Sequence, residues 1–530
     1  MTDVAVYDTT LRDGTQREGI SLACSDKLRI AEQLDALGVT FIEGGWPGSN
    51  PKDAELFRRA RDIEWTHATL CAFGSTRRAD VSPDDDANLA ALIASEAPAC
   101  TIFGKTSLRH VREVLRTTPD ENLAMIEDSV RYLRSHGRRV IYDAEHFFDG
   151  AREDADYAFA TLLAAEHGGA EAIVLCDTNG GTMPWEIEAR VREVALVLPV
   201  AIGIHAHDDA GCAVANSLAA VRAGATHVQG TLNGYGERCG NANLTTIIPN
   251  LELKLGMRCI RALAELGRVS RYTAELANLA FDEHAPYVGR SAFAHKGGVH
   301  VAAIRRSPRS YEHVDPAVVG NRTRFVVSEL SGRGNVRAIA EAHDVEVAAD
   351  LEAGVLDSVK DREARGFAFE SAEASVALMI RRAEPGYVPP FELVDHKVLA
   401  GKREGVAAFV DAAVKVRVRG ELVHTAAEGN GPVSALDAAL RKALAAAYPE
   451  VRDIHLEDYK VRIIDGREGT SAVTRVLIDH GNGHDRWTTV GASPNILDAS
   501  LAALVDGIEH GLWLVRKGER DEGHDRLAAG

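Results

Sequence analysis

Hydrophobic and polar positions follow two alternating periods along the first half of the chain. Short runs of β-branched and apolar residues are separated by stretches in which apolar residues recur every three or four positions. This pattern predicts strands that alternate with amphipathic helices. The predicted strands are residues 3–7, 40–44, 67–73, 99–103, 139–143, 172–176, 201–205 and 227–231, and the clearest helices between them are 25–37, 51–61, 122–136, 154–167 and 211–223.

Eight strands with intervening helices over roughly 260 residues have the size and alternation of a (β/α)8 TIM barrel. A doubly wound open sheet is the alternative. No Gly-x-Gly-x-x-Gly follows the first predicted strand, and this disfavours a dinucleotide-binding fold. We therefore predict an α/β chain whose residues 1–260 form a catalytic (β/α)8 barrel.

The pattern changes twice after the barrel. Residues 261–395 are helical and more polar, and we expect a linker region of small helical subdomains. Beyond 396, strand-like runs at 412–419, 421–427, 456–464, 473–479 and 486–490 are interrupted by two helices, each preceded by small residues and a proline (429–432, GNGP; 491–494, GASP). This repetition predicts a duplicated βββα unit, an α+β domain over 396–515. The charged tail 516–530 lacks apolar periodicity and is predicted to be disordered.

Composition narrows the classes of protein that the chain can represent. Its 530 residues are too many for one core, and a formal net charge of −18 argues against binding nucleic acid or an anionic membrane. The seven cysteines are scattered and form no Cys-x-x-Cys pair, as expected for reduced thiols. Without a leader-like N-terminus or an apolar run of membrane-spanning length, the sequence predicts a cytoplasmic protein.

Polar residues gather just after the ends of the predicted strands. Arg12 and Asp13 follow the first strand, Glu145 follows the fifth, and His205 and His207 lie at the seventh. Residues i and i+2 of a strand point to the same face, so the two histidines can hold neighbouring positions of one metal ion while Asp13 supplies a carboxylate. The carboxyl ends of barrel strands are where active sites are built. We predict a metal site there.

The donor types suit chemistry next to a carbonyl. Asp13, His205, His207 and the side-chain oxygen of Asn241 form a mixed oxygen and nitrogen set. Such a set favours Mn, Zn, Mg or Co over metals that prefer thiolates. A metal held there can chelate a 2-oxoacid and polarise its keto group. Arg12 is a natural partner for a substrate carboxylate, with a structural ion pair as the alternative.

Four motifs carry a family resemblance: 8–14 (DTTLRDG), 205–209 (HAHDD), 234–241 (GYGERCGN) and 298–300 (GVH). Together they resemble the metal-dependent barrels that condense acyl-CoA, the family of 2-isopropylmalate, homocitrate and citramalate synthases. Segments 41–53 and 142–150 are most similar to the citramalate-forming branch. Where many leucine-pathway relatives have Glu-Val-Gly-Phe, this chain has Glu-Gly-Gly-Trp at 43–46. The resemblance covers nearly the whole chain.

The resemblance implies a Claisen-type condensation of acetyl-CoA with pyruvate, followed by thioester hydrolysis to (R)-citramalate and CoA, for isoleucine biosynthesis. The alternative is 2-isopropylmalate synthesis from 2-oxoisovalerate, for leucine. By resemblance, Glu145 and His300 serve in acid/base catalysis, with Arg12 and Tyr311 beside them. Arg12, Thr178 and Asn179 would bind and orient the oxoacid.

The resemblance also implies an assembly. His300 follows the barrel in the sequence, so we expect it to enter the site from a partner subunit and the enzyme to be a homodimer with composite active sites. The linker 261–395 would complete these sites. Residues 396–515 resemble the leucine- or isoleucine-sensing regulatory domain of the family, and isoleucine is the expected feedback effector.

Three other classes remain at this stage. Two histidines and a carboxylate also form the facial triad of non-haem Fe(II) oxygenases, although the ligand order there is usually His-x-Asp…His on a β-sandwich. A lyase that cleaves a 3-hydroxyacyl-CoA shares the barrel motifs, but the C-terminal repeat favours a feedback-controlled synthase. An amino-acid sensor with an inactive barrel is disfavoured, because the complete set of candidate catalytic residues is present.

Overall fold

The computed structural model describes residues 3–328, 331–342, 349–402, 409–464, 466–483 and 485–528. The chain divides into two compact units. The first comprises Met1–Phe293 with Val314–Arg322, and the second comprises Ala294–His313 with Thr323–Gly530. Among the described residues, no helix combines the length and apolar character needed to cross a membrane, and all seven cysteines are free thiols.

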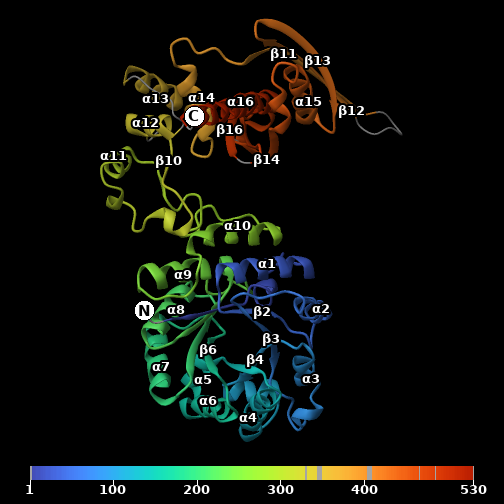
Figure 1. Cartoon of the computed structure of the whole chain (residues 1–530), viewed down its shortest axis with the longest axis vertical. Helices are drawn as coiled ribbons and strands as arrows, with labels where there is room; N and C mark the ends of the chain where they lie inside the picture. Colours follow the sequence, from blue (N-terminus) through green and yellow to red (C-terminus); the bar gives the residue numbers. More distant parts are fainter. Residues whose placement is uncertain are drawn as a thin grey trace. The chain divides into compact units, whose positions relative to one another are not determined.

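The first unit is a closed barrel of eight parallel strands in sequence order, which confirms the predicted TIM barrel. Strand β8 pairs in parallel with β1, with Ala5 opposite His227 and Asp8 opposite Gly230, and this pairing closes the ring. The helices lie outside the strands (Figure 1). The strands are β1 (Ala5–Asp8), β2 (Phe41–Gly45), β3 (Thr69–Ser75), β4 (Ala99–Lys105), β5 (Arg139–Glu145), β6 (Ala172–Asp177), β7 (Ala201–Ala206) and β8 (His227–Gly230).

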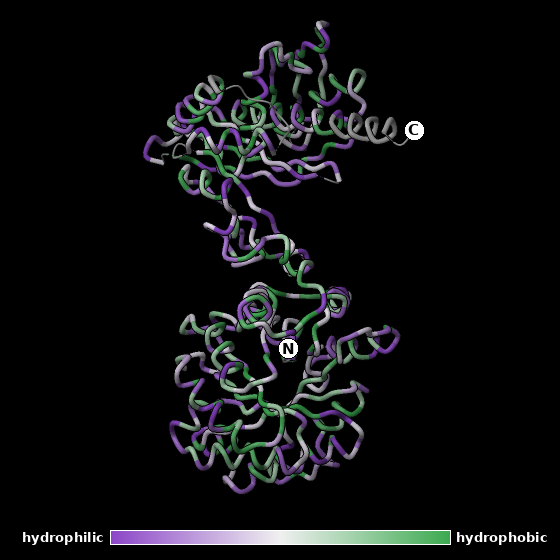
Figure 2. The backbone as a smooth tube through the Cα atoms, turned by 60° about the vertical axis from the view of Figure 1, so that its left-hand side comes forward, coloured by the Kyte–Doolittle hydropathy of each residue, from purple (hydrophilic) through white to green (hydrophobic). Residues whose placement is uncertain are grey.

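Burial explains why these strands form apolar runs. Residues that face outward pack against the helices in one large core, whereas Tyr7, Phe41, Cys71, Ile141 and their neighbours form a separate cluster inside the ring. Hydrophobic segments of the tube in Figure 2 accordingly alternate with hydrophilic ones along the barrel. The principal outer helices are α1 (Cys24–Leu37), α2 (Pro51–Ala60), α3 (Ala87–Ala94), α4 (Pro119–Ser135), α6 (Ala155–Gly168), α7 (Pro184–Val197), α8 (Ala213–Arg222), α9 (Leu244–Leu253) and α10 (Leu266–Leu276).

Strands β4 and β5 exceed their predicted lengths by more than the other barrel strands do. Strands β4 and β5 each continue two residues beyond the predicted ends at 103 and 143, and Lys105 and Glu145 are the last pair in their register. Both of these charged residues therefore belong to the ordered rim of the barrel. Helix α5 (Phe147–Glu153) follows at once, after His146 turns the chain with a left-handed φ of 60°.

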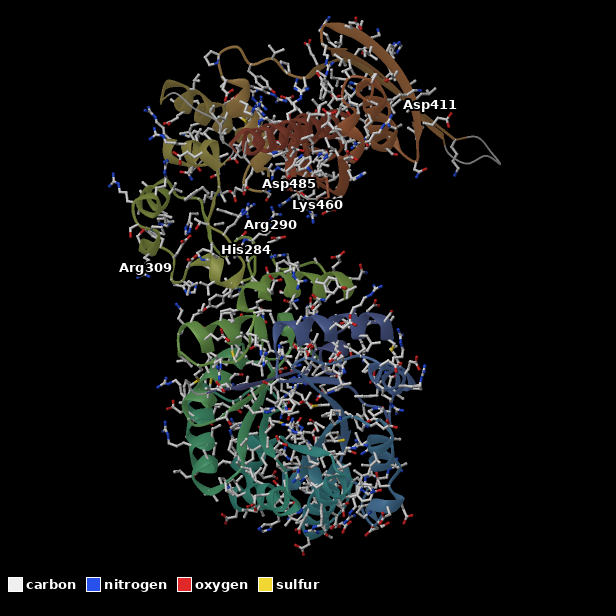
Figure 3. The ribbon with its side chains drawn as sticks, viewed as in Figure 1. His284, Arg290, Arg309, Asp411, Lys460 and Asp485 are labelled. Atoms are coloured by element: carbon white, nitrogen blue, oxygen red, sulfur yellow. The ribbon has the colours of Figure 1, made fainter. Side chains whose placement is uncertain are left out.

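The second unit contains the predicted βββα duplication. Strands β11 (Phe391–Gly401), β12 (Phe409–Val418) and β13 (Glu421–Gly429) precede helix α15 (Pro432–Leu444), and strands β14 (His455–Ile463), β15 (Thr474–Gly481) and β16 (Arg486–Ser493) precede α16 (Ile496–Ala528). Each sheet is antiparallel with strands in sequence order. Exposed polar side chains such as Lys460 lie on β14 (Figure 3).

Two features of this unit differ from the expected pattern. Strand β11 has no counterpart in the prediction, because a register shift between Leu393 and Asp395 breaks the alternation of apolar and polar residues. Helix α16 continues through residues 516–528, where a disordered tail over 516–530 was expected. Most of these residues are Lys, Arg, Glu, Ala and Leu, which favour helix even without an apolar face. Residues 529–530 lie outside the described part.

Helices α11 (Gly298–Arg306), α12 (Arg333–Ala342), α13 (Ala349–Ala364) and α14 (Glu373–Arg382) fill the segment between the barrel and the sheets. Helix α14 is attached to α16 by ion pairs: Arg382 donates to Asp506 at 2.8 Å and to Glu509 at 2.6 Å. Tyr387 also donates to Glu509, at 2.6 Å. This network joins the linker helices to the second βββα repeat.

Two glycines test how tightly the barrel unit is packed. Gly38 and Gly19 have φ values of 89° and 88°, but an added Cβ would lie 2.9 Å from the backbone nitrogen of Arg261 at Gly38 and would meet nothing within 4 Å at Gly19. We expect Gly19→Ala to cost about 1–2 kcal/mol of unfolding free energy from backbone strain. Gly38→Ala should cost about 1–3 kcal/mol more from overpacking. Urea unfolding measures the loss of unfolding free energy in both variants. Equal losses would show that the segment around Arg261 moves away from the added methyl group at no cost.

Candidate metal centre and active site

The structure brings three of the predicted metal ligands together at the carboxyl end of the barrel. Asp13 Oδ2 lies 3.3 Å from His205 Nε2 and 4.0 Å from His207 Nε2. One ligand atom from each residue lies within 4.8 Å of the others, and all three residues are buried. His205 comes from β7 and His207 follows its end, while Asp13 follows β1. Barrel closure places these segments side by side.

A hydrogen-bonded chain orients His205. Its Nδ1 lies 2.8 Å from Gln229 Oε1, which can only accept, so Nδ1 carries the proton. The amide of Gln229 in turn donates to Asp143 Oδ1 at 2.9 Å. This arrangement leaves Nε2 of His205, which faces Asp13, as the nitrogen that a metal ion can bind once its proton is lost. A second hydrogen bond of this kind is what fixes the tautomer of a metal-binding histidine.

Two buried polar atoms at this centre have no hydrogen-bond partner among the described residues. They are Asn241 Oδ1 and His207 Nδ1. Asn241 pairs with His207 through a short antiparallel bridge, and its amide nitrogen donates to the carbonyl of Tyr235 at 3.2 Å. The Asn241 oxygen is therefore an unsatisfied buried acceptor beside the three clustered ligands. Such atoms cost free energy unless a ligand or ion satisfies them, so the donor set fits a divalent cation.

The electrostatics of the centre favour an ionised carboxylate at Asp13, a neutral imidazole at His207 and a proton on His205. Burial raises the pKa of Asp13, but the charge of Arg12 and the hydrogen bond with His205 outweigh it, so the pKa lies well below its usual range. Burial lowers the pKa of His207 to about 4. For His205, burial lowers the pKa, yet the hydrogen bond and charge of Asp13 raise it further and the net shift is upward. A bound cation would replace that proton.

Arg12 is held in a buried polar cluster next to the metal ligands. Its Nε donates to Glu43 Oε1 at 2.5 Å, and its Nη1 lies 3.6 Å from Asp13. The other oxygen of Glu43 accepts from the hydroxyl of Tyr7 at 2.9 Å. The guanidinium carbon lies 3.7 Å from the centre of the Phe73 ring. A structural ion pair was the alternative role for Arg12, and the pair with Glu43 does exist. Because it uses Nε, the Nη groups of Arg12 remain available to a ligand.

An aromatic wall stands beside Arg12. Trp46 lies edge-on to Phe73 and Phe103, with ring centres 5.6 and 5.7 Å apart, and Phe73 stacks on Phe103 at 5.5 Å. The indole nitrogen of Trp46 donates to Asn88 at 2.8 Å, which fixes the ring. These side chains limit the space next to the guanidinium.

The other predicted rim residues of the barrel have defined partners. Glu145 forms an ion pair with Lys105, and both are largely but not completely buried. The hydroxyl of Thr178 accepts the backbone N–H of His146 at 2.9 Å, which leaves its own proton to donate. Asn179 is exposed, and its amide donates to Asp149 at 2.7 Å.

The last two predicted residues, His300 and Tyr311, belong to the second unit. Their rings stack with centres 4.2 Å apart, and Tyr311 keeps 47% of its surface exposed. His295 lies 3.5 Å from Glu312 in the same segment. His300 on helix α11 and Tyr311 just after it thus present an imidazole and a phenol hydroxyl that are accessible to a substrate.

The sequence reading missed several residues that organise the centre: Tyr7, Asp143 and Gln229, together with the roles of Glu43 and Lys105 as partners of Arg12 and Glu145. Burial raises the pKa of Asp143 to about 7. A signal existed for Asp143 and Gln229, because each is a polar residue inside an otherwise apolar strand. A buried polar side chain needs a partner, but the sequence does not say which.

Comparison with known proteins adds the family context. Residues 3–272 match the HMGL-like family model, 287–366 match the homocitrate synthase post-HMGL domain-like model, and 370–512 match the LeuA allosteric (dimerisation) domain. The last match begins upstream of residue 396, where the sequence placed the domain boundary.

Three curated relatives match the chain over nearly its full length. It is 53% identical to an (R)-citramalate synthase of Synechocystis sp., over 98% of this chain and 97% of the relative. It is 51% identical to an (R)-citramalate synthase of Geobacter sulfurreducens, over 99% of both chains. A probable 2-isopropylmalate synthase of Methanopyrus kandleri is 32% identical, over 95% of this chain and 97% of the relative.

Proposed function

This chain belongs to the HMGL-like family as a citramalate synthase, and we propose that it condenses acetyl-CoA with pyruvate to give (R)-citramalate and CoA for isoleucine biosynthesis. The observation that carries this proposal is the match to (R)-citramalate synthases over 98–99% of the chain. The buried cluster of Asp13, His205 and His207 supplies chemistry that fits it.

We assign the metal site to Asp13, His205, His207 and Asn241. When bound there, a divalent ion (Mn, Zn, Mg or Co) supplies Lewis-acid stabilisation of the oxygen on a keto carbon under attack. Gln229 supports this by keeping the Nδ1 proton on His205. The unsatisfied oxygen of Asn241 completes the donor set.

Arg12 binds the carboxylate of the 2-oxoacid in this proposal. Glu43 holds the guanidinium through Nε, so the Nη groups are available for two charge-assisted hydrogen bonds to the substrate. Thr178 can donate its hydroxyl proton to the same substrate because that oxygen already accepts from His146. Asn179 has its amide engaged by Asp149 and offers only its carbonyl oxygen, so we assign it a secondary part.

Glu145 is the proposed base. The ion pair with Lys105 holds its side chain at the rim of the barrel. A proton passes from the methyl group of acetyl-CoA to Glu145, and the resulting enolate carbon forms a bond to the keto carbon of pyruvate. The new alkoxide takes a proton from an acid, for which we propose His300 with Tyr311 beside it. Water then attacks the thioester, the C–S bond breaks, and CoA leaves as the thiol.

Substrate size is the first test of this assignment. The wall of Trp46, Phe73 and Phe103 beside Arg12 leaves room for the methyl group of pyruvate and crowds the isopropyl group of 2-oxoisovalerate. We expect kcat/KM, measured by CoA-thiol release with acetyl-CoA, to be at least about tenfold higher for pyruvate. A higher kcat/KM with 2-oxoisovalerate would instead support the alternative, 2-isopropylmalate synthase.

The second test separates proton transfer from metal binding. Glu145→Gln should lower kcat by about 10²–10⁴-fold because the amide cannot take the proton, while calorimetry still detects Mn²⁺ and pyruvate binding. Asp13→Ala should lose metal and activity together. Glu193→Gln, an exposed glutamate on α7, is the matched control and should be unchanged. Near-normal turnover of Glu145→Gln would remove this residue from the role of base.

We propose that the enzyme is a homodimer in which residues 261–395 of one subunit complete the site of the other. The match of residues 370–512 to a dimerisation domain supports a dimer, and His300 lies outside the barrel unit. The free cysteines agree with a cytoplasmic location, which we also propose.

Subunit mixing tests the composite site. Inactive His300→Ala and inactive Asp13→Ala subunits, once exchanged, should regain up to about a quarter of wild-type activity, because half of the dimers are mixed and each mixed dimer holds one intact site. Exchange is verified with two affinity tags. Recovery that fails in verified mixed dimers would place His300 in the site of its own subunit.

Isoleucine is the effector we propose for the C-terminal domain. The match to an allosteric domain supports effector control. Helix α15 begins at Pro432 without a side-chain cap, so its first turn can offer backbone N–H groups to a carboxylate. Helix α16 begins at Ile496, where Asn495 Oδ1 accepts the N–H of Leu497 at 2.9 Å.

Effector binding should couple to activity through the linker helices. Full-length protein should bind isoleucine by calorimetry, and saturating isoleucine should raise the KM for pyruvate about 5–150-fold, the usual range of allosteric coupling. A variant that ends at Pro390 should keep no response. An absence of binding heat with isoleucine, leucine and valine alike would leave the domain as a dimerisation module only.

A further inference from the structure

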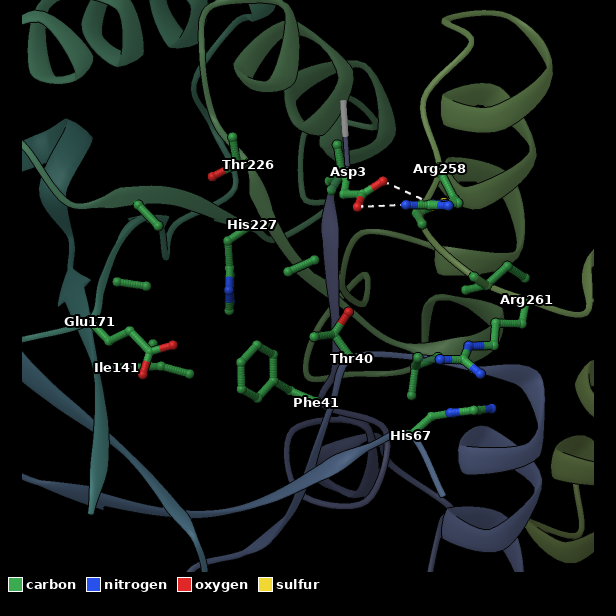
Figure 4. Close-up of a pocket in the computed structure, with 18 of the residues that line it drawn as sticks. Asp3, Thr40, Phe41, His67, Ile141, Glu171, Thr226, His227, Arg258 and Arg261 are labelled. Atoms are coloured by element: carbon green, nitrogen blue, oxygen red, sulfur yellow. Dashed lines mark hydrogen bonds and ion pairs between the residues drawn. The ribbon is translucent and has the colours of Figure 1, made fainter. Parts of the chain in front are cut away.

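Trp46 lies at the same end of the barrel as the metal centre. Strand β2 begins at Phe41, which lines a cavity at the amino ends of the strands (Figure 4), and it ends at Gly45. Trp46 is the first residue beyond the carboxyl end of this strand, where the active sites of such barrels are built. Its indole packs edge-on to Phe73, the ring that covers the guanidinium of Arg12. The orientation of the indole therefore sets the room beside Arg12.

The backbone of Trp46 is held by a buried carboxylate. Asp53 Oδ2 accepts the N–H of Trp46 at 2.9 Å, and its other oxygen accepts from Lys27 at 2.6 Å. Both Asp53 and Lys27 are buried. Gly45 has a φ of 146° and leaves the space that Asp53 occupies, because a Cβ there would collide with the carboxylate. With its main chain held in this way, the remaining freedom of Trp46 is rotation of its side chain.

Asn88 restricts that rotation. Its Oδ1 accepts the indole N–H at 2.8 Å, and its Nδ2 donates to the carbonyl of Ser75 at 2.7 Å. Asn88 lies in the first turn of α3, and Ser75 is the last residue of β3. The amide uses its acceptor at one end and its donor at the other, so a flipped amide would lose both bonds. One side chain thus ties the orientation of the indole to the end of the neighbouring strand.

Two glycines let this amide approach the strand ends closely. An added Cβ at Gly74, on β3, would lie 3.0 Å from Asn88 Oδ1. At Gly48, in the turn after β2, it would lie 3.5 Å from the same oxygen and 3.6 Å from the indole nitrogen of Trp46. The chain therefore surrounds the hydrogen bond with positions that have no side chain to displace it.

We propose that Asn88 is a positioning residue that sets the selectivity among 2-oxoacids by holding Trp46. This inference rests on the proposed function, because it requires the oxoacid to bind at Arg12. The hydrogen bond keeps the indole edge-on to Phe73 and Phe103, with ring centres 5.6 and 5.7 Å away. A branched substrate side chain then meets a wall that does not yield and is excluded by overpacking. Without an acceptor at residue 88, the indole rotates and the larger oxoacid fits.

Kinetics with two oxoacids test this role. Asn88→Leu removes both hydrogen bonds with little change in shape. It should lower the ratio of kcat/KM for pyruvate to kcat/KM for 2-oxoisovalerate at least about fivefold. The change should come from a lower KM for 2-oxoisovalerate, with kcat for pyruvate within about twofold of the wild type, because Asn88 touches no reacting group. Asn88→Asp keeps an oxygen for the indole N–H and should retain the wild-type ratio.

Asn250→Leu is the matched control. Asn250 is likewise a half-buried asparagine on a helix, α9. Its amide nitrogen donates to the carbonyl of Thr246 at 2.9 Å, and its oxygen accepts from the hydroxyl of Tyr287 at 2.9 Å. The control should lose thermal stability without a change in the selectivity ratio. An equal loss of selectivity in Asn250→Leu, or an unchanged ratio in folded Asn88→Leu, would overturn the proposal.

A double-mutant cycle tests whether the effect passes through Trp46. Phenylalanine has no N–H group, so Asn88→Leu in a Trp46→Phe background should change the ratio by less than about twofold. A full further loss of selectivity there would contradict the proposal. Near-ultraviolet circular dichroism gives a readout that needs no substrate. Asn88→Leu should lose the band that Trp46→Phe loses, whereas Asn88→Asp should keep it, and a band that persists in Asn88→Leu would show that the indole does not need the amide.

The same kinetics separate this inference from the function on which it rests. A wild-type enzyme that prefers 2-oxoisovalerate would overturn the proposed function and, with it, the role of Asn88. A wild-type preference for pyruvate that Asn88→Leu leaves unchanged would overturn the role of Asn88 alone.

Discussion

The hydrogen bonds between β8 and β1 are the constraint on which the rest of this molecule depends. They pair residues more than two hundred positions apart, from Ala5 with His227 to Asp8 with Gly230. Only this closure brings the segment after β1, which carries Asp13, next to the histidines of β7. One set of backbone contacts therefore positions the candidate metal centre.

Removing charged side chains from water is the main unfavourable free-energy contribution at the carboxyl end of the barrel. Arg12 and Glu43 are both removed from water, and a buried pair is stable only if its remaining donors and acceptors are used. The hydroxyl of Tyr7 donates a hydrogen bond to the second carboxylate oxygen of Glu43. The hydroxyl of Thr101 lies 2.6 Å from the hydroxyl of Tyr7. The guanidinium is partly covered by Phe73. Its remaining Nη donors are the groups that the proposed substrate carboxylate would occupy, so the free site retains an unmet interaction.

Much of this architecture could be predicted from local patterns, and the failures have physical causes. The barrel strands are continuous apolar runs, and the ligands Asp13, His205 and His207 lie in short motifs, so both are visible in the sequence. Strand β11 was missed because its bulge near Leu393 breaks the period of two on which strand prediction depends. The partners Gln229 and Asp143 come from different strands. Their contact depends on the closure of the barrel, so no local sequence pattern predicts it.

Gln229 separates two ionisable side chains with a group that does not ionise. Proton relays need members that can both accept and release a proton, and a carboxamide does neither near neutral pH. The chain from Asp143 through Gln229 to His205 transmits orientation but does not conduct protons. Burial puts the pKa of Asp143 near 7, so this carboxyl group can titrate within the physiological range. The amide keeps the Nδ1 proton on His205 in both protonation states of Asp143, so that titration changes the charge near the ligands without changing which nitrogen faces them.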